Sequence, residues 1–197
     1  MATAVGSVTL NPVYIPFLQK PSCCAVTCLQ MILYRNGVRL YDQEELAQRF
    51  GVKIGSEEQD AFRSGMPVRE RLNYDEGIST MESVDALNKF FAEESIGMKA
   101  TRYMYSQIES LQELLIENLR NNNEIWIEYH SQEIHDSEHI HDGLVESVDL
   151  TAQTVVIIDP VPRRRQRITV PIAMLERALS ATFGKELGVI SVKKVDL

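Results

Sequence analysis

The chain has few cysteines, no long apolar run and no excess of positive charge, and each absence excludes a class of protein. Its 197 residues include only three cysteines, and two of them, Cys23 and Cys24, are adjacent. A framework of conventional disulfides is therefore implausible, and the thiols indicate a reducing compartment. No stretch approaches the roughly 18 apolar residues that read as a membrane span.

The N-terminus and the charge balance narrow the location and the partners further. The opening MATAVGSVTL lacks the basic start and apolar run of a signal peptide, so we expect a cytoplasmic protein. With 20 basic and 28 acidic side chains the net charge is −8, which argues against nucleic acid or an anionic membrane as partner. One basic run, formed by Arg163, Arg164, Arg165 and Arg167, is either a solvated loop or a site for an acidic peptide or carboxylate.

The order of the patterned segments predicts a single α+β domain spanning residues 1–197. Periodicity and capping residues predict helices over 23–35, 43–51, 81–94, 107–119 and 171–180. Alternation and β-branched residues predict strands within 7–18 and over 99–105, 124–130, 144–149, 154–158, 168–170 and 188–194. We expect residues 52–80 to form a surface excursion and residues 131–138 a polar loop. Helices precede most of the strands, as is typical of helices packed on an antiparallel sheet.

The segment 19–34, QKPSCCAVTCLQMILY, predicts a buried helix with cysteines in its first turn. If Ser22 is the N-cap, Cys23 and Cys24 lie where free backbone amides and the helix dipole favour an anion such as a thiolate. The alternative is that these cysteines are ordinary core residues, since cysteine is among the most buried residue types. For Cys28, beside Leu29, packing is the better interpretation.

All four histidines, His130, His135, His139 and His141, fall within one short region. In one interpretation His141, at the start of a strand, is a general base that Asp159, at the end of the neighbouring strand, orients across the hairpin. In another, the histidines with Asp136 and Asp142 bind a metal ion, although their spacing fits no compact template. The remaining possibility is a solvated loop for His130, His135 and His139. We expect neither a metal nor a cofactor.

The order glutamine, cysteine at the head of a buried helix, histidine, then aspartate resembles the papain-like cysteine peptidases, and more narrowly the C39 peptidase and C39-like group. The matching nucleophile segment consists of Gln19, Cys24, Ala25, Val26, Thr27, Cys28, Leu29, Gln30 and Met31. His141 is followed by GLVESVD two residues on, and Asp159–Pro160 follows VVII. Cys23 and Ala25 stand where the group usually has an acid and a glycine. The similarity covers most of residues 15–192.

This resemblance implies a papain-like fold and a hydrolase that cleaves a peptide or amide bond through an acyl-enzyme. Gln19 would donate to the oxyanion, Cys24 would attack the carbonyl, His141 would shuttle the proton and Asp159 would orient His141. The partner would be a peptide or protein substrate. Three alternatives stay open: Cys23 as the nucleophile, acyl transfer instead of hydrolysis, and a catalytically inactive C39-like domain that binds a peptide or partner.

Overall fold

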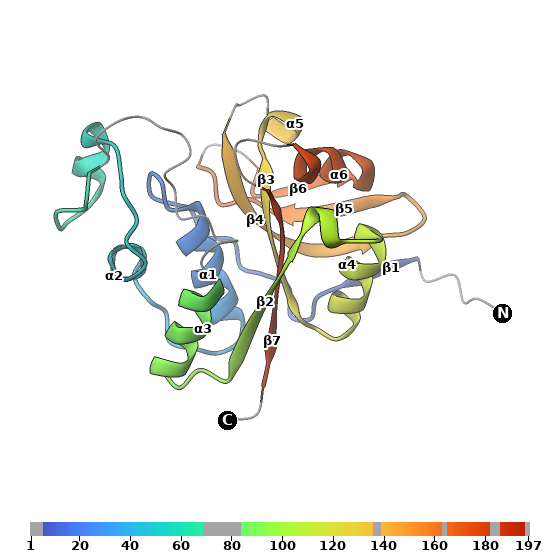
Figure 1. The fold of residues 1–197 in the computed structure, drawn as a ribbon, viewed down its shortest axis with the longest axis horizontal. Helices are drawn as coiled ribbons and strands as arrows, with labels where there is room; N and C mark the ends of the chain where they lie inside the picture. The colour runs from blue at the N-terminus through green and yellow to red at the C-terminus, as the bar shows by residue number, and fades with distance from the viewer. Residues whose placement is uncertain (1–5, 69–83, 136–138, 163–164, 182–185, 196–197) are drawn as a thin grey trace.

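The computed structural model describes residues 6–68, 84–135, 139–162, 165–181 and 186–195, and within these ranges the chain forms one antiparallel seven-stranded sheet with helices on both sides (Figure 1). The strands are β1 (Ser7–Thr9), β2 (Met98–Met104), β3 (Glu124–His130), β4 (Ile140–Asp149), β5 (Thr154–Ile158), β6 (Arg167–Pro171) and β7 (Gly188–Lys194). The α-helices are α1 (Cys24–Arg35), α2 (Gln43–Arg49), α3 (Val84–Glu93), α4 (Leu111–Arg120), α5 (Gln132–His135) and α6 (Ile172–Ser180). Two 3-10 helices are η1 (Ser56–Ala61) and η2 (Tyr105–Gln107).

The strand order is β2-β7-β3-β4-β5-β6, and β1 pairs with the far end of β4. Every pairing between these strands is antiparallel. In Figure 1, α1, α2 and α3 lie to one side of the central strands, and α4, α5 and α6 lie to the other. The α+β class and the antiparallel sheet that the sequence predicts are therefore confirmed. No helix in the described ranges is long and apolar enough to cross a membrane.

Helix α1 begins one residue later than predicted. Ser22 is not the N-cap, because its backbone has a positive φ of 58° and its hydroxyl donates to Glu58 Oε2 at 3.0 Å. Cys23 takes the N-cap position without a side-chain capping bond, and Cys24 is the first helical residue. The helix ends at Arg35, with Asn36 as its C-cap, and Gly37 follows with a φ of 75°, a left-handed conformation that glycine adopts without steric cost.

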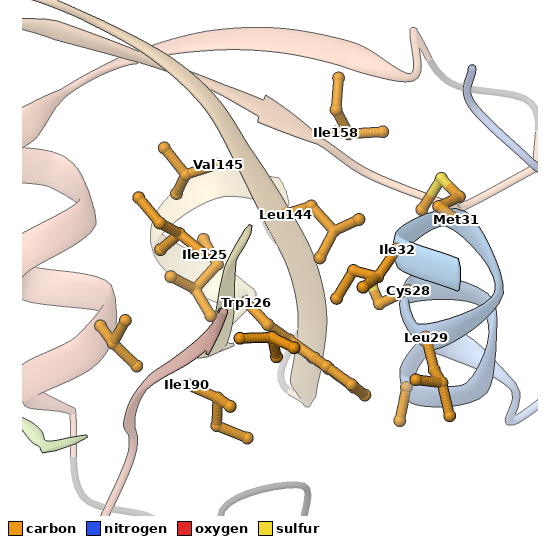
Figure 2. Packing of buried hydrophobic residues seen from close by; sticks show 14 of the residues in the cluster. Cys28, Leu29, Met31, Ile32, Ile125, Trp126, Leu144, Val145, Ile158 and Ile190 are labelled. Carbon is orange, nitrogen blue, oxygen red and sulfur yellow. The ribbon is translucent and has the colours of Figure 1, made fainter. Parts of the chain in front are cut away.

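Helix α1 packs on the sheet through an almost entirely apolar face. Figure 2 shows Leu29 and Ile32 lying across from Trp126 of β3 and Leu144 of β4. Alternation over residues 124–130 predicts a strand that is buried on one face only, but every residue of β3 is buried, so that prediction is wrong. Helices cover both faces of the sheet, and this leaves no solvated side for β3 to expose.

Most predicted boundaries agree with the structure within a few residues, and β5 and β7 agree at both ends. Helix α4 starts four residues later than predicted, because the Ser110 hydroxyl accepts from the Glu113 N–H and residues 105–107 form η2. The predicted polar loop 131–138 contains α5, and its residues 136–138 lie outside the described residues. Residues 69–83 also lie outside the described residues. They include the last part of the predicted 52–80 excursion and the first residues of the helix predicted over 81–94.

One residue of the basic run has a structural role instead of forming a solvated loop. Arg167 contacts Glu146 through Nε at 2.8 Å and donates from Nη2 to the Tyr14 carbonyl at 2.5 Å. Glu146 also accepts from the Tyr14 backbone N–H at 2.9 Å. This network attaches the segment before α1 to β4 and β6. Arg165 is exposed, and Arg163 and Arg164 lie outside the described residues.

We predict that Met31→Ala lowers the free energy of unfolding by about 2 to 5 kcal/mol, because Met31 is 1% exposed in the interface between α1 and the sheet. Chemical denaturation measures the change. Leu40→Ala, at a side chain that is 57% exposed, is the control and is expected to change stability little. Equal losses in the two variants would contradict the assignment of α1 to the core.

We predict that Glu44→Gln destabilises the protein at pH 7 and that the difference from the unmutated protein disappears in acid. Hydrogen bonds from Lys20, the Arg63 backbone and Ser64 lower the pKa of Glu44 from 4.5 to about 2. A depressed folded-state pKa stabilises the fold above the unfolded value, and this stabilisation is lost as the pH falls from about 4.5 towards 2. Denaturation at several pH values tests this, with Glu45→Gln, whose partner Arg39 is exposed, as the control. A difference that is independent of pH would contradict it.

Candidate active site

Three segments remote in sequence meet where α1 begins, β4 begins and β5 ends. The Gln19 backbone N–H donates to the Pro160 carbonyl at 2.9 Å. This bond holds the segment that leads to Cys24 against the residue after Asp159. A turn closed by the Cys23 N–H and the Lys20 carbonyl, at 3.1 Å, then leads into α1. The four residues Gln19, Cys24, His141 and Asp159 are thereby gathered in one region.

Cys24 is the most accessible of the three cysteines and contacts β4 directly. Cys24 is partly exposed, whereas Cys23 and Cys28 are buried. The Cys24 thiol donates to Asp142 Oδ2 at 3.2 Å, and the other oxygen of Asp142 accepts from Trp126 Nε1 at 2.8 Å. The sulfur therefore lies beside Asp142, the residue that follows His141 on β4.

This environment keeps Cys24 in its thiol form. Burial of the sulfur, followed by the negative charge of Asp142 and its hydrogen bond, raises the thiol pKa well above its ordinary value. Backbone N–H groups of Asp142 and Ala25 act in the opposite direction but are weaker. The position at the head of a helix does not by itself produce the thiolate that the sequence suggested, because desolvation and a nearby carboxylate both oppose the anion. Burial likewise raises the pKa of Cys23 to about 12.

His141 and Asp159 form a buried pair. His141 Nε2 lies 2.9 Å from Asp159 Oδ1, and the same oxygen accepts from the Val161 backbone N–H at 2.8 Å. Burial alone would raise the pKa of Asp159, but hydrogen bonds from His135 and His141 and the Val161 N–H outweigh it and hold that pKa well below its usual range. The prediction that these two side chains meet across the hairpin is confirmed.

The Cys24 thiol is hydrogen-bonded to the residue of β4 that follows His141, and not to His141 itself. Successive strand residues project to opposite faces. Asp142 projects to the face that carries α1 and Trp126, while His141 packs edge-on against the Tyr129 ring, with centroids 5.6 Å apart. Within the described residues, no hydrogen bond joins the Cys24 sulfur to the His141 ring. The structure thus brings His141 to Asp159, and it brings Cys24 to Asp142.

The Gln19 backbone is held beside Pro160, and no hydrogen bond of the Gln19 side chain is seen in the described part of the chain. Its Oε1 atom is buried and has no hydrogen-bond partner there. A side-chain amide that makes no structural bond keeps its NH₂ group available to a ligand. This is compatible with the oxyanion role that the resemblance implies for Gln19.

Two residues of the site were not recognised from the sequence. Asp142 entered the sequence argument only as a possible metal ligand, yet it is the partner of the Cys24 thiol. His135 was assigned to a loop or a metal site, and its Nε2 lies 2.5 Å from Asp159 Oδ2. The clustering of histidines was the only signal for His135. Across the described ranges, no group of three or more histidine, cysteine or acidic side chains has an arrangement that could hold a metal ion, and Asp136 lies outside them.

Comparison with known proteins gave no family assignment: no protein-family model and no curated protein matched the chain.

We predict that Asp142→Asn lowers the Cys24 thiol pKa and speeds alkylation of Cys24 at pH 7. Asparagine keeps the shape of the side chain and an acceptor for Trp126 but removes the negative charge that opposes the thiolate. A change that yields on the order of ten times more thiolate raises the iodoacetamide rate nearly in proportion. Mass spectrometry of the alkylated protein measures that rate.

Asp149→Asn, at the other end of β4, is the control with an equal loss of charge and is expected to leave the rate unchanged. An Asp142→Asn rate equal to or below that of the unmutated protein would show that Asp142 does not suppress the thiolate.

Proposed function

We propose that the protein is a papain-like cysteine peptidase-like hydrolase of the C39-like type, which cleaves a peptide or amide bond through an acyl-enzyme. The observation that carries the proposal is the convergence of its four candidate residues from three remote segments. Gln19 is bonded to Pro160, His141 is bonded to Asp159, and Cys24 lies against the residue that follows His141. The partly exposed position of Cys24, with Cys23 buried at the N-cap, favours Cys24 as the nucleophile.

In the proposed reaction His141 takes the proton of the Cys24 thiol as the sulfur attacks the substrate carbonyl carbon. Because His141 Nε2 faces Asp159, its Nδ1 is the nitrogen that accepts this proton. The Gln19 amide and the backbone N–H at Cys24 stabilise the oxyanion. The C–N bond then breaks, and His141 returns the proton to the leaving amine. Water, deprotonated by His141, hydrolyses the thioester and releases the acid and the free thiol.

The arrangement in the structure is a resting state in this proposal. The thiol must leave the Asp142 carboxylate and meet the His141 ring of the neighbouring β4 residue. A substrate that excludes water from the site would favour this exchange. The raised thiol pKa means that the proton stays on sulfur until His141 accepts it during the attack.

The hydrogen bond between Cys24 and Asp142 supports a second candidate function, a catalytically inactive C39-like domain that binds a peptide or partner. Asp142 holds the Cys24 proton, and His141 is directed to the other face of β4. A domain that had lost its chemistry would keep the Gln19–Pro160 and His141–Asp159 contacts as structural ones. Labelling and turnover separate the two functions.

We predict that a peptide aldehyde protects Cys24 from iodoacetamide at pH 8 and that Cys24→Ala abolishes both labelling at this position and hydrolysis of peptides. His141→Ala and Asp159→Asn are expected to reduce turnover on the order of 100-fold or more, because each removes a part of the proton shuttle. Mass spectrometry follows the label and the peptide products.

Cys23→Ala is the matched control and is expected to retain labelling and turnover. Loss of both in Cys23→Ala, with Cys24→Ala active, would assign Cys23 as the nucleophile. If no peptide is hydrolysed and peptide binding persists in Cys24→Ala, the inactive binding domain is the correct function. Products that incorporate an added amine would indicate acyl transfer.

A further inference from the structure

The Asp159 carboxylate lies between two imidazoles, only one of which the proposed mechanism uses. His141 Nε2 is 2.9 Å from Oδ1, and His135 Nε2 is 2.5 Å from Oδ2. The side chains of His135, His141 and Asp159 are 7%, 3% and 1% exposed. Water therefore has little access to the carboxylate, and its two oxygens depend on the protein for their partners.

The two oxygens are not equivalent in their partners. Oδ1 accepts from both His141 and the Val161 backbone N–H, so its position is held at two points. His135 Nε2 lies 2.5 Å from Oδ2 as an ion-pair contact, and Oδ2 has no hydrogen-bond partner in the described part of the chain. A carboxylate that lost this contact while remaining buried would either take up a proton or rotate to find another donor. Either change alters the hydrogen bond between Asp159 Oδ1 and His141.

His135 is itself held in place by the fold. Helix α5 follows β3 directly, and the His135 backbone N–H donates to the Ser131 carbonyl at 2.6 Å. Glu133 of the same helix pairs with Arg177 of α6 at 3.0 Å, and Figure 1 shows α5 beside α6. The Tyr129 hydroxyl lies 3.3 Å from His135 Nε2. A side chain fixed from these directions can orient a carboxylate.

We propose that His135 is a positioning residue that holds the Asp159 carboxylate in the plane in which Oδ1 meets His141, and so keeps the His141 hydrogen on Nε2 and its Nδ1 free to act as base. The His141 imidazole, which faces Oδ1 through Nε2, carries its hydrogen there. His135 acts through Asp159 and contacts no reacting atom. The inference rests on the proposed function for its catalytic consequence, but its structural part stands without activity.

The surroundings contain several groups that could compete with His135 for this role. The titratable groups facing the two imidazoles or close to them are Tyr129 on β3, His139 before β4, Asp142 on β4, Cys24 and Cys28 on α1, and the Glu133–Arg177 pair between α5 and α6. Of these, Tyr129 and His139 contact the rings, and their contacts are edge-on ring packing or a bond to His135. Neither takes the place of His135 at Asp159 Oδ2.

The test measures the tautomer of His141 by ¹H–¹⁵N NMR of the histidine side chains, in the unmutated protein, His135→Ala, His135→Gln and the control Glu113→Gln at an exposed residue of α4. The chain has only four histidines, so single substitutions assign the signals. We expect a slowly exchanging Nε2 proton on His141 in the unmutated protein and its loss in His135→Ala. Glutamine can present an N–H group to Oδ2, so His135→Gln is expected to restore the signal, and Glu113→Gln to leave it unchanged.

Peptide hydrolysis in the same variants tests the catalytic consequence. For His135→Ala we expect kcat to fall about tenfold or more, a part of what acid–base catalysis supplies, with KM within about twofold and recovery of kcat in His135→Gln. An unchanged His141 signal in folded His135→Ala overturns the proposal. A loss in Ala that Gln does not restore assigns His135 a merely structural role and also overturns it. If the signal behaves as expected and no variant hydrolyses peptides, the proposed function fails while the positioning role stands.

Discussion

The packing of α1 on β4 is the constraint on which the rest of the site depends. Leu29, Met31 and Ile32 are at most 1% exposed in this interface, so α1 cannot rotate or slide without opening the core. That packing fixes the height of the first helical residue relative to the sheet, and Cys24 consequently reaches the beginning of β4. The position of Cys24 is thus set by the packing of apolar side chains that take no part in the site themselves.

Buried charges then decide what the site can do in its resting form. The Arg35–Glu124 pair, with 2% exposure on each side chain, joins the end of α1 to β3, and Glu146 with Arg167 attaches the segment before α1 to the sheet. At the other end of the helix, Asp142 accepts hydrogen bonds from the Cys24 thiol and from Trp126 Nε1. A carboxylate in that position stabilises the thiol over the thiolate. Asp142 therefore holds Cys24 in its less reactive thiol form.

Asp159 is the counterpart of Asp142 on the other face of β4. It accepts from His141 and a backbone N–H, and His135 Nε2 lies 2.5 Å from its other oxygen; these groups keep it ionised despite its burial. Gly143, on the same face of β4 as His141, allows this crowding, because a Cβ there would lie 2.9 Å from Ile157 Cγ2 and 3.4 Å from the Tyr129 ring. His141 and Gly143 thus face one side of β4, and Asp142 between them faces the other.

Local sequence patterns were sufficient for the elements and for the pairing of His141 with Asp159. Alternation identified β5 and β7 at both ends, Gly37 and Asp42 marked helix boundaries, and a hairpin with few intervening residues necessarily brings its two ends together. These are short-range effects, and each depends on residues that are close in the chain. The N-cap of α1 is an exception, because the positive φ of Ser22 and its bond to Glu58 come from a distant segment.

Only the tertiary structure decided which acid meets the thiol and what that does to its reactivity. The strand pattern assigns His141 and Asp142 to opposite faces of β4, but it does not say which face α1 covers. The face on which α1 packs decides whether Cys24 meets a base or a carboxylate. The role of His135 was hidden for a related reason, since α5 and α6 place it at Asp159 through contacts between residues far apart in the chain. Desolvation, which raises the Cys24 pKa, belongs to the folded state alone, because an isolated helix end remains in water.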